Sequence, residues 1–142
     1  MPTMSFQYVE ENGFHRPKVP FTITANGNTT ETVGLVDSGS DFVLLPAGIA
    51  RALGITLSRK KETAGGVGGE ISFKTGLATM TVRKGNKKKV MRQIKVRVHS
   101  EDEGSQEFDE ILLGRDPFFK YFKIEFDENA KKVRLHPNRR SP

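Results

Sequence analysis

The chain has 142 residues, a formal net charge of +6 and no cysteine. This length suits one domain with its own hydrophobic core, and the lack of cysteine excludes disulfides and cysteine-based metal sites. The three histidines, His15, His99 and His136, are far apart in sequence and form no ligand pair, so neither a metal nor a cofactor is expected.

The first half of the chain is predicted to contain mostly short strands. The first covers residues 6–10, and two more, at 19–25 and 31–36, flank Asn26-Gly27-Asn28, which is a strong hairpin signal. Residues 46–53 have the pattern of a short helix. Pro46 suits its first turn, and Gly54 is expected to end it.

The second half continues in the same way. Strands are expected at 71–73 and 77–82, and Gly85-Asn86 marks a turn between strands at 79–83 and 90–98. Asp116 is predicted to cap a short helix that starts at Pro117 and runs to Phe122. A last hairpin pairs 123–126 with 132–135. The domain is expected to span residues 1–137, with a basic tail at 138–142, and so many short strands predict a closed or sandwiched β fold.

Much of the positive charge lies in residues 83–97, around the turn at Gly85-Asn86. Lysines at a hairpin tip usually form a solvated surface, and no aromatic residue lies within this run to stack on bases. The acidic block at 101–110 indicates separate charged patches instead of one basic groove. No nucleic-acid partner is therefore expected, although a basic β-barrel that binds nucleic acid is kept as the less favoured alternative.

The most informative stretch is VGLVDSGSDFVLLP, residues 33–46, in which Asp37 stands between two apolar runs. An unpaired buried carboxylate is costly, so an acid at this place must lie where its charge is useful. Gly39 lets the backbone turn tightly beside it. Ser38 and Ser40 place hydroxyl groups within reach of the carboxylate or of nearby backbone.

Two further motifs follow. TAGGVGGEISF, residues 63–73, has four glycines around Val67 and fits neither the dinucleotide fingerprint nor the phosphate-binding loop. It is either a turn with no role or a flap that closes over an extended substrate. ILLGRD, residues 111–116, is predicted to be a buried strand whose Gly114 packs close to another backbone.

In this order and at these distances, DSGS, GGVGG and ILLGRD resemble the retropepsin family of aspartic proteases, over residues 18 to 136. The GGVGG tip is similar to that of the viral enzymes. The helix after the DSGS loop and the closing hairpin are more similar to cellular and prokaryotic members. The resemblance implies a mainly β, single-domain closed barrel with one or two short helices, completed as a homodimer.

The resemblance also implies roles for individual residues. Asp37 would be the catalytic acid, and Gly65, Gly66, Val67, Gly68 and Gly69 would form the flap. The active-site loop would be supported by Ser38, which braces the two loops across the dimer, by Gly39, by Ser40, and by a bidentate pair of Arg115 with Asp41. We further expect the Ser40 hydroxyl to donate to the Asp37 carboxylate, which would favour the charged form and an acidic pH optimum.

The chain offers one such aspartate and is too short for two lobes, so a second carboxylate must come from a twofold-related copy. The expected function is that of a homodimeric aspartic endopeptidase acting on peptide or protein substrates. The alternative is a retropepsin-fold module that dimerises or binds peptides with little turnover. No apolar run approaches a membrane span or a secretion segment, so no membrane segment and a cytoplasmic location are expected.

Overall fold

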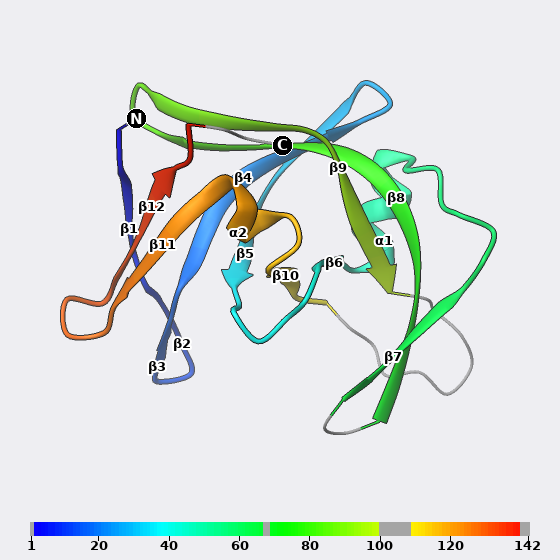
Figure 1. Ribbon diagram of the computed structural model, residues 1–142, viewed down its shortest axis with the longest axis horizontal. Coiled ribbons are helices and arrows are strands. Elements are labelled where there is room, and N and C mark those ends of the chain that lie inside the picture. Colours follow the sequence, from blue (N-terminus) through cyan, green and yellow to red (C-terminus); the bar gives the residue numbers. More distant parts are fainter. Residues whose placement is uncertain (1, 67–68, 100–108, 140–142) are drawn as a thin grey trace.

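The computed structural model of the chain describes residues 2–66, 69–99 and 109–139. Most of these residues lie in strands, and the two helices are short (Figure 1). The elements in chain order are β1 Met4–Gln7, β2 Val9–Glu11, β3 Phe14–Arg16, β4 Lys18–Ala25, β5 Asn28–Val36, β6 Val43–Leu45, α1 Ala47–Leu53, β7 Glu62–Gly66, β8 Gly69–Lys84, β9 Lys87–His99, β10 Ile111–Leu113, α2 Phe118–Tyr121, β11 Phe122–Asp127 and β12 Lys132–Pro137.

Six of these strands close into a barrel in the order β4-β5-β10-β6-β9-β8. The barrel closes where β4 pairs with β8, with Ile23 opposite Met80. β7 extends this sheet as a hairpin partner of β8. The predicted mainly β closed barrel with short helices is therefore confirmed, and closure leaves the six strands without a free edge between them.

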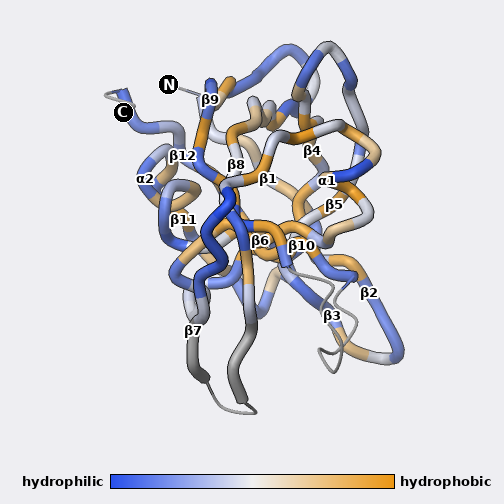
Figure 2. Tube along the Cα trace, turned by 90° about the vertical axis from the view of Figure 1, so that its right-hand side faces the viewer, coloured by the Kyte–Doolittle hydropathy of each residue, from blue (hydrophilic) through white to orange (hydrophobic). Residues whose placement is uncertain are grey.

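The core lies inside this barrel and beneath the three-stranded sheet β1-β12-β11, here called the terminal sheet. Along β4, the side chains of Val19, Phe21 and Ile23 are buried, and the residues between them are less so, as expected for a strand with one face on a core. Figure 2 shows apolar residues gathered in the barrel and hydrophilic residues along the projecting hairpins. Each fully buried Leu, Ile or Phe contributes about 1.5–3 kcal/mol to stability.

A second sheet joins the two ends of the described chain, in the order β1-β12-β11. Met4 of β1 lies opposite Leu135 of β12, and both are buried. On its polar face, Arg134 donates to Glu125 at 2.8 Å and to Asp127 at 3.2 Å. The final hairpin predicted from the sequence is thus confirmed, and β1 covers the far edge of β12.

The basic β8–β9 hairpin packs partly against this terminal sheet. Lys87 donates to the Thr3 carbonyl oxygen at 3.0 Å, and the ammonium of Lys84 lies 5.3 Å from the centroid of the Phe6 ring. The ammonium of Lys89 lies 5.7 Å from the Tyr121 ring centroid. These lysines therefore have contacts within the fold, whereas the sequence predicted only a solvated surface.

Several predicted turns and helix ends match the structure because they depend on local signals. Asn26 and Gly27 have φ of 51° and 77°, the left-handed values that a tight two-residue hairpin turn requires. Helix α1 begins after Pro46 and ends at Gly54, which has φ of 67° and donates its N–H to carbonyl groups of the last turn.

Other expectations were wrong in detail. The strands expected at 71–73 and 77–82 are parts of one strand, β8. The β2–β3 hairpin was not predicted, although its turn residues Asn12 and Gly13 carry the same signal as Asn26-Gly27. Asp116 does not cap α2: the N-cap is Pro117, with no side-chain cap bond, and Asp116 pairs instead with Lys120 at 3.2 Å.

Neither helix in the described part of the chain has the length and apolar character needed to cross a membrane.

Candidate active site

The candidate site is built around β10, which lies between β5 and β6 in the barrel. β10 pairs in parallel with β5, where Leu113 lies opposite Val36, and antiparallel with β6, where Leu113 lies opposite Val43. The chain leaves β5 after Val36 and returns in β6 at Val43, so residues 37–42 must cross the end of β10. Two apolar strands thereby fix both ends of the loop that carries Asp37.

Asp37 is half-buried at the start of this loop. Its N–H donates to the Leu113 carbonyl oxygen at 3.2 Å, which continues the β5–β10 pairing by one residue. Its Oδ1 accepts the Gly39 N–H at 2.9 Å, and its carbonyl accepts the Ser40 N–H at 3.2 Å. Oδ2 has no hydrogen-bond partner among the described residues. The arrangement fixes the direction of the carboxyl group and leaves one oxygen for a ligand.

Gly114 lets the chain after β10 pass directly under the loop. A Cβ atom on Gly114 would lie 2.0 Å from the Phe42 carbonyl oxygen and 2.7 Å from the Ser40 carbonyl oxygen. No side chain fits at this distance, so the glycine is required. The predicted close approach of Gly114 to another backbone is confirmed.

Main-chain hydrogen bonds hold the two segments together at this point. The Arg115 N–H donates to Ser40 O at 2.8 Å, and the Asp116 N–H donates to Asp41 O at 2.9 Å. The Val43 N–H in turn donates to Asp116 O at 3.2 Å. Three bonds of this kind contribute about 1 kcal/mol each. The position of the Asp37 loop is therefore set by backbone groups.

The two serines of the loop differ in their contacts. Ser40 Oγ donates to the Phe42 carbonyl oxygen at 2.9 Å and accepts the Phe42 N–H at 3.4 Å. The expected donation from Ser40 to the Asp37 carboxylate is therefore wrong, because the hydroxyl's one proton is used within the turn. Ser38 is exposed, and its hydroxyl has no partner among the described residues.

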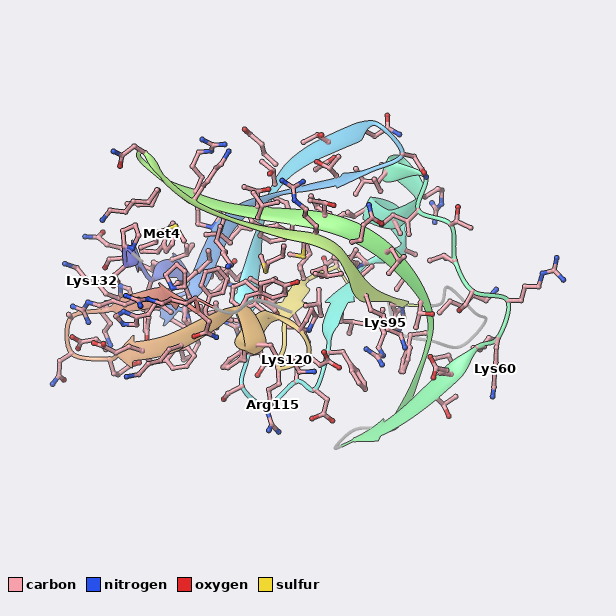
Figure 3. The ribbon with its side chains drawn as sticks, turned by 45° about the horizontal axis from the view of Figure 1, so that its top comes forward. Met4, Lys60, Lys95, Arg115, Lys120 and Lys132 are labelled. Atoms are coloured by element: carbon pink, nitrogen blue, oxygen red, sulfur yellow. The ribbon has the colours of Figure 1, made fainter. Side chains whose placement is uncertain are left out.

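Arg115 and Asp41 do lie side by side, but not as the expected bidentate pair. A single contact joins Arg115 Nη1 to Asp41 Oδ1 at 4.0 Å, and the two side chains are 66% and 74% exposed. Figure 3 shows Arg115 extending outward from the loop, away from the barrel. An exposed pair at this distance contributes little to stability within one chain.

The β7–β8 hairpin projects from the same end of the barrel as the Asp37 loop (Figure 1). Glu62 of β7 pairs with Phe73 of β8, and the pairing continues to Gly66 opposite Gly69. The predicted hairpin is confirmed up to these glycines. Val67 and Gly68, the middle of the predicted flap tip, lie outside the described residues.

Arg97, at the end of β9, is a site residue that the sequence analysis did not identify. Its guanidinium carbon lies 3.5 Å from the centroid of the Phe42 ring and 5.6 Å from that of Phe73. Burial lowers the pKa of the Arg97 guanidinium, while the charges of Glu62 and Asp116 act in the opposite direction. A signal was present in the sequence: in IKVRV, residues 94–98, the charged residues alternate with the core residues.

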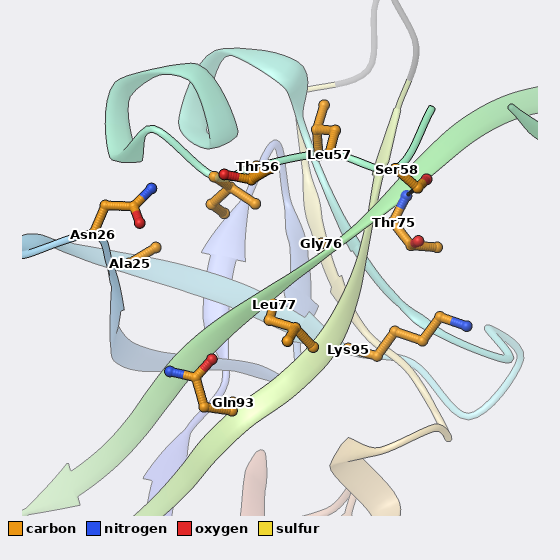
Figure 4. Close-up of a pocket in the computed structure, with 11 residues that line it drawn as sticks. Ala25, Asn26, Thr56, Leu57, Ser58, Thr75, Gly76, Leu77, Gln93 and Lys95 are labelled. Atoms are coloured by element: carbon orange, nitrogen blue, oxygen red, sulfur yellow. Dashed lines mark hydrogen bonds between the residues drawn. The ribbon is translucent and has the colours of Figure 1, made fainter. Parts of the chain in front are cut away.

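A groove elsewhere on the barrel surface carries none of this chemistry. It lies where residues 55–58 pass over β8 and β9, and Leu77, Thr75 and Lys95 line it (Figure 4). Its lining contains one cation and no carboxylate. Among the described residues no cluster of three potential metal ligands occurs.

Comparison with known proteins agrees with this assignment of the fold. Residues 19–116, which include Asp37 and the β10 segment, match the sequence profile of a family described as Aspartyl protease. The chain belongs to the aspartyl protease family. No curated protein matches its sequence.

Many solved structures are similar to the chain, and two of them are described here. The crystal structure of a retropepsin-like aspartic protease from Rickettsia conorii has 21% sequence identity and a TM-score of 0.58, and the match covers 95% of this chain and 99% of that one. The EIAV protease in complex with an inhibitor has 23% identity and a TM-score of 0.48, with coverage of 79% and 93%. The first of these similarities shows that the chain has a retropepsin-like fold.

Proposed function

We propose that the protein is an aspartic endopeptidase that hydrolyses peptide bonds with Asp37 and the same aspartate of a second copy, in a homodimer. The observation that carries this proposal is the setting of Asp37. Its carboxyl group is fixed by the Gly39 amide, keeps one oxygen without a partner among the described residues, and lies on a loop locked by Gly114. A carboxylate held in this way is suited to act on a water molecule.

The chemistry requires two carboxylates, and the described part of the chain has only one in this setting. When two carboxyl groups lie a few ångströms apart, both cannot be ionised, so the pair shares one proton. The ionised group acts as general base on water, which attacks the peptide carbonyl. The protonated group donates first to the carbonyl oxygen and then to the leaving amine. A twofold axis beside the Asp37 loop supplies the second group.

Two exposed features of the loop fit a contact with a second copy. The Ser38 hydroxyl has no partner within the described part of the chain, although its neighbours are held by several hydrogen bonds. Arg115 and Asp41 are largely exposed and far from ideal pairing geometry. In the proposed dimer, Ser38 contacts the partner's loop. The interface also shields the ion pair between Arg115 and Asp41 from solvent, which strengthens it.

The β7–β8 hairpin is proposed as the flap that covers the substrate, with Gly65 to Gly69 as its tip. It projects on the side where Asp37 is located, and β7 is paired only along one edge, with β8, among the described strands. A peptide in the cleft would lie between this hairpin and the Asp37 loop. Closure of the hairpin would exclude water during the reaction.

The test is hydrolysis of a peptide library by the wild type, by Asp37→Asn and by the matched control Glu31→Gln. Glu31 lies on β5, the strand that leads to Asp37, but is exposed near its other end. We expect Asp37→Asn to be inactive, because an amide cannot serve as a base, and Glu31→Gln to be as active as wild type. Hydrolysis by purified Asp37→Asn would remove Asp37 from the mechanism.

Mixing experiments test the shared site. Wild type is mixed with Asp37→Asn at a fixed total concentration and allowed to exchange subunits. If both carboxylates are needed, activity follows the square of the wild-type fraction, because mixed dimers are inactive. A linear dependence would show that one chain is sufficient. A folded wild type that cleaves no peptide but binds peptides would instead support the module without turnover.

A further inference from the structure

Arg97 has a charge that packing alone does not explain. It is one of two buried polar residues in the described part of the chain, with 9% of its surface exposed. Its Nε is sealed from solvent and has no hydrogen-bond partner there. Glu62 and Asp116 act on it electrostatically, but neither forms a hydrogen bond with this Nε.

An apolar side chain would fill this place without the free-energy cost of burying a charged group. The Arg97 guanidinium stacks over the Phe42 ring, at 3.5 Å from its centroid, and lies beside the Phe73 ring, at 5.6 Å. An arginine keeps its charge when it is buried, so the unpaired donor is a standing cost to the folded state. Such a cost calls for a functional explanation, and the two terminal nitrogens of the guanidinium, which are not sealed, are the donors that a ligand can reach.

The position of Arg97 indicates which ligand this is. Phe42 is the residue through which the Asp37 loop enters β6, and its backbone bonds to Ser40. Phe73 pairs with Glu62 at the base of the β7–β8 hairpin. The guanidinium therefore lies between the catalytic loop and the base of the proposed flap, at the edge of the space that a bound peptide would occupy.

We propose that Arg97 is a specificity-determining residue that binds the carboxylate side chain of an Asp or Glu in the peptide substrate. This inference rests on the proposed function. The planar fork of a guanidinium matches the two oxygens of a carboxylate, and the aromatic rings hold its plane.

The experiment uses pairs of C-terminally amidated peptides that differ only by Glu or Gln at one position around the scissile bond. At one position, the wild type is expected to prefer Glu over Gln by on the order of 10- to 100-fold in kcat/KM, the effect of one hydrogen-bonded charge pair. Arg97→Met should abolish this preference, so that its kcat/KM values for the Glu and Gln peptides are equal. Arg97→Lys should keep part of it, because lysine retains the charge without the fork.

The matched control is Arg92→Met, which removes an exposed arginine from the same strand and should leave the preference unchanged. The thermal midpoint of Arg97→Met should equal or exceed that of wild type, because methionine fills the space without an unpaired charge. Equal cleavage of Glu and Gln peptides by wild type at every position would overturn the proposal. So would an Arg97→Met variant that is less stable and equally impaired on both peptides.

Failure of the proposed function can be told apart from failure of this inference. If the wild type cleaves none of the peptides, binding of the same pairs is measured by fluorescence anisotropy for the wild type and Arg97→Met. Tighter binding of the Glu peptide that is lost in Arg97→Met supports the role of Arg97 without turnover. Equal binding of both peptides by the wild type refutes it.

Discussion

Replacing Gly114 by alanine is the sharpest test of how the Asp37 loop is held. The added Cβ would lie 2.0 Å from the Phe42 carbonyl oxygen, whereas ordinary contact begins at 3.4 Å. The two backbones must therefore separate by about 1.4 Å, the difference between these distances. A shift of this size would break the bond from Arg115 N–H to Ser40 O, which is 2.8 Å long, and its neighbour from Asp116 to Asp41.

Overpacking of this kind costs about 1–3 kcal/mol, and two lost backbone bonds add about 1 kcal/mol each. The total of about 3–5 kcal/mol should lower the thermal midpoint by about 10 °C or more in a domain of this size. Catalysis should fall further, since a displacement of about 1 Å in a catalytic group can cost about 100-fold in rate.

The assay combines thermal unfolding with kcat/KM on one peptide, and Gly48→Ala is the control. Gly48 lies in α1, and a Cβ atom added to it would meet no other atom within 4 Å, so alanine should stabilise the helix by about 0.5–1 kcal/mol. If Gly114→Ala is as stable and as active as Gly48→Ala, the close approach does not position the loop.

Three other substitutions have defined outcomes. Ser40→Ala should cost about 1 kcal/mol in urea unfolding and leave the pH dependence of kcat/KM in place, because Ser40 donates to Phe42 and not to Asp37; a displaced profile would contradict this. Arg115→Ala should change the free energy of unfolding at low protein concentration by less than about 1 kcal/mol, since its side chain is exposed, and a larger loss would show a stronger pair. Hydrogen bonds from the Ala130 amide, which has the larger effect, and from Arg134 lower the pKa of Asp127. The charged carboxylate therefore stabilises the fold, and the wild type should lose this stabilisation as the pH falls from about 5 toward the lowered pKa. Thermal midpoints of Asp127→Asn should vary less over that range, and equal acid sensitivity would refute the assignment.

The sequence predicted those features that depend on a few adjacent residues or on a strict steric requirement. Asn26-Gly27 specifies a turn because both residues must adopt positive φ, and Gly54 ends α1 for the same reason. Gly114 was expected to approach another backbone closely, and it does so at Phe42. The catalytic role of Asp37 itself stays a prediction until activity is measured.

The features that the sequence did not predict depend on contacts between distant segments. Ser40 could have bonded to Asp37 or to the turn, and only the path of the chain toward β6 decides for Phe42. The separation and exposure of Arg115 and Asp41 likewise depend on the tertiary arrangement. Arg97 was overlooked because its significance comes from Phe42 and Phe73, which lie far from it in sequence.

The locking of the Asp37 loop by main-chain bonds has a consequence for how this protein can change. Every residue has a backbone carbonyl, and every residue except proline has a backbone N–H. The shape of the loop therefore depends little on which side chains stand at 38, 41 and 115. Those side chains are free to diverge under other pressures, such as recognition of one partner copy over another. Two variants of this chain in one cell can therefore differ at these surface positions so that each forms a dimer only with itself. The geometry around Asp37 stays the same in both, because main-chain bonds set it.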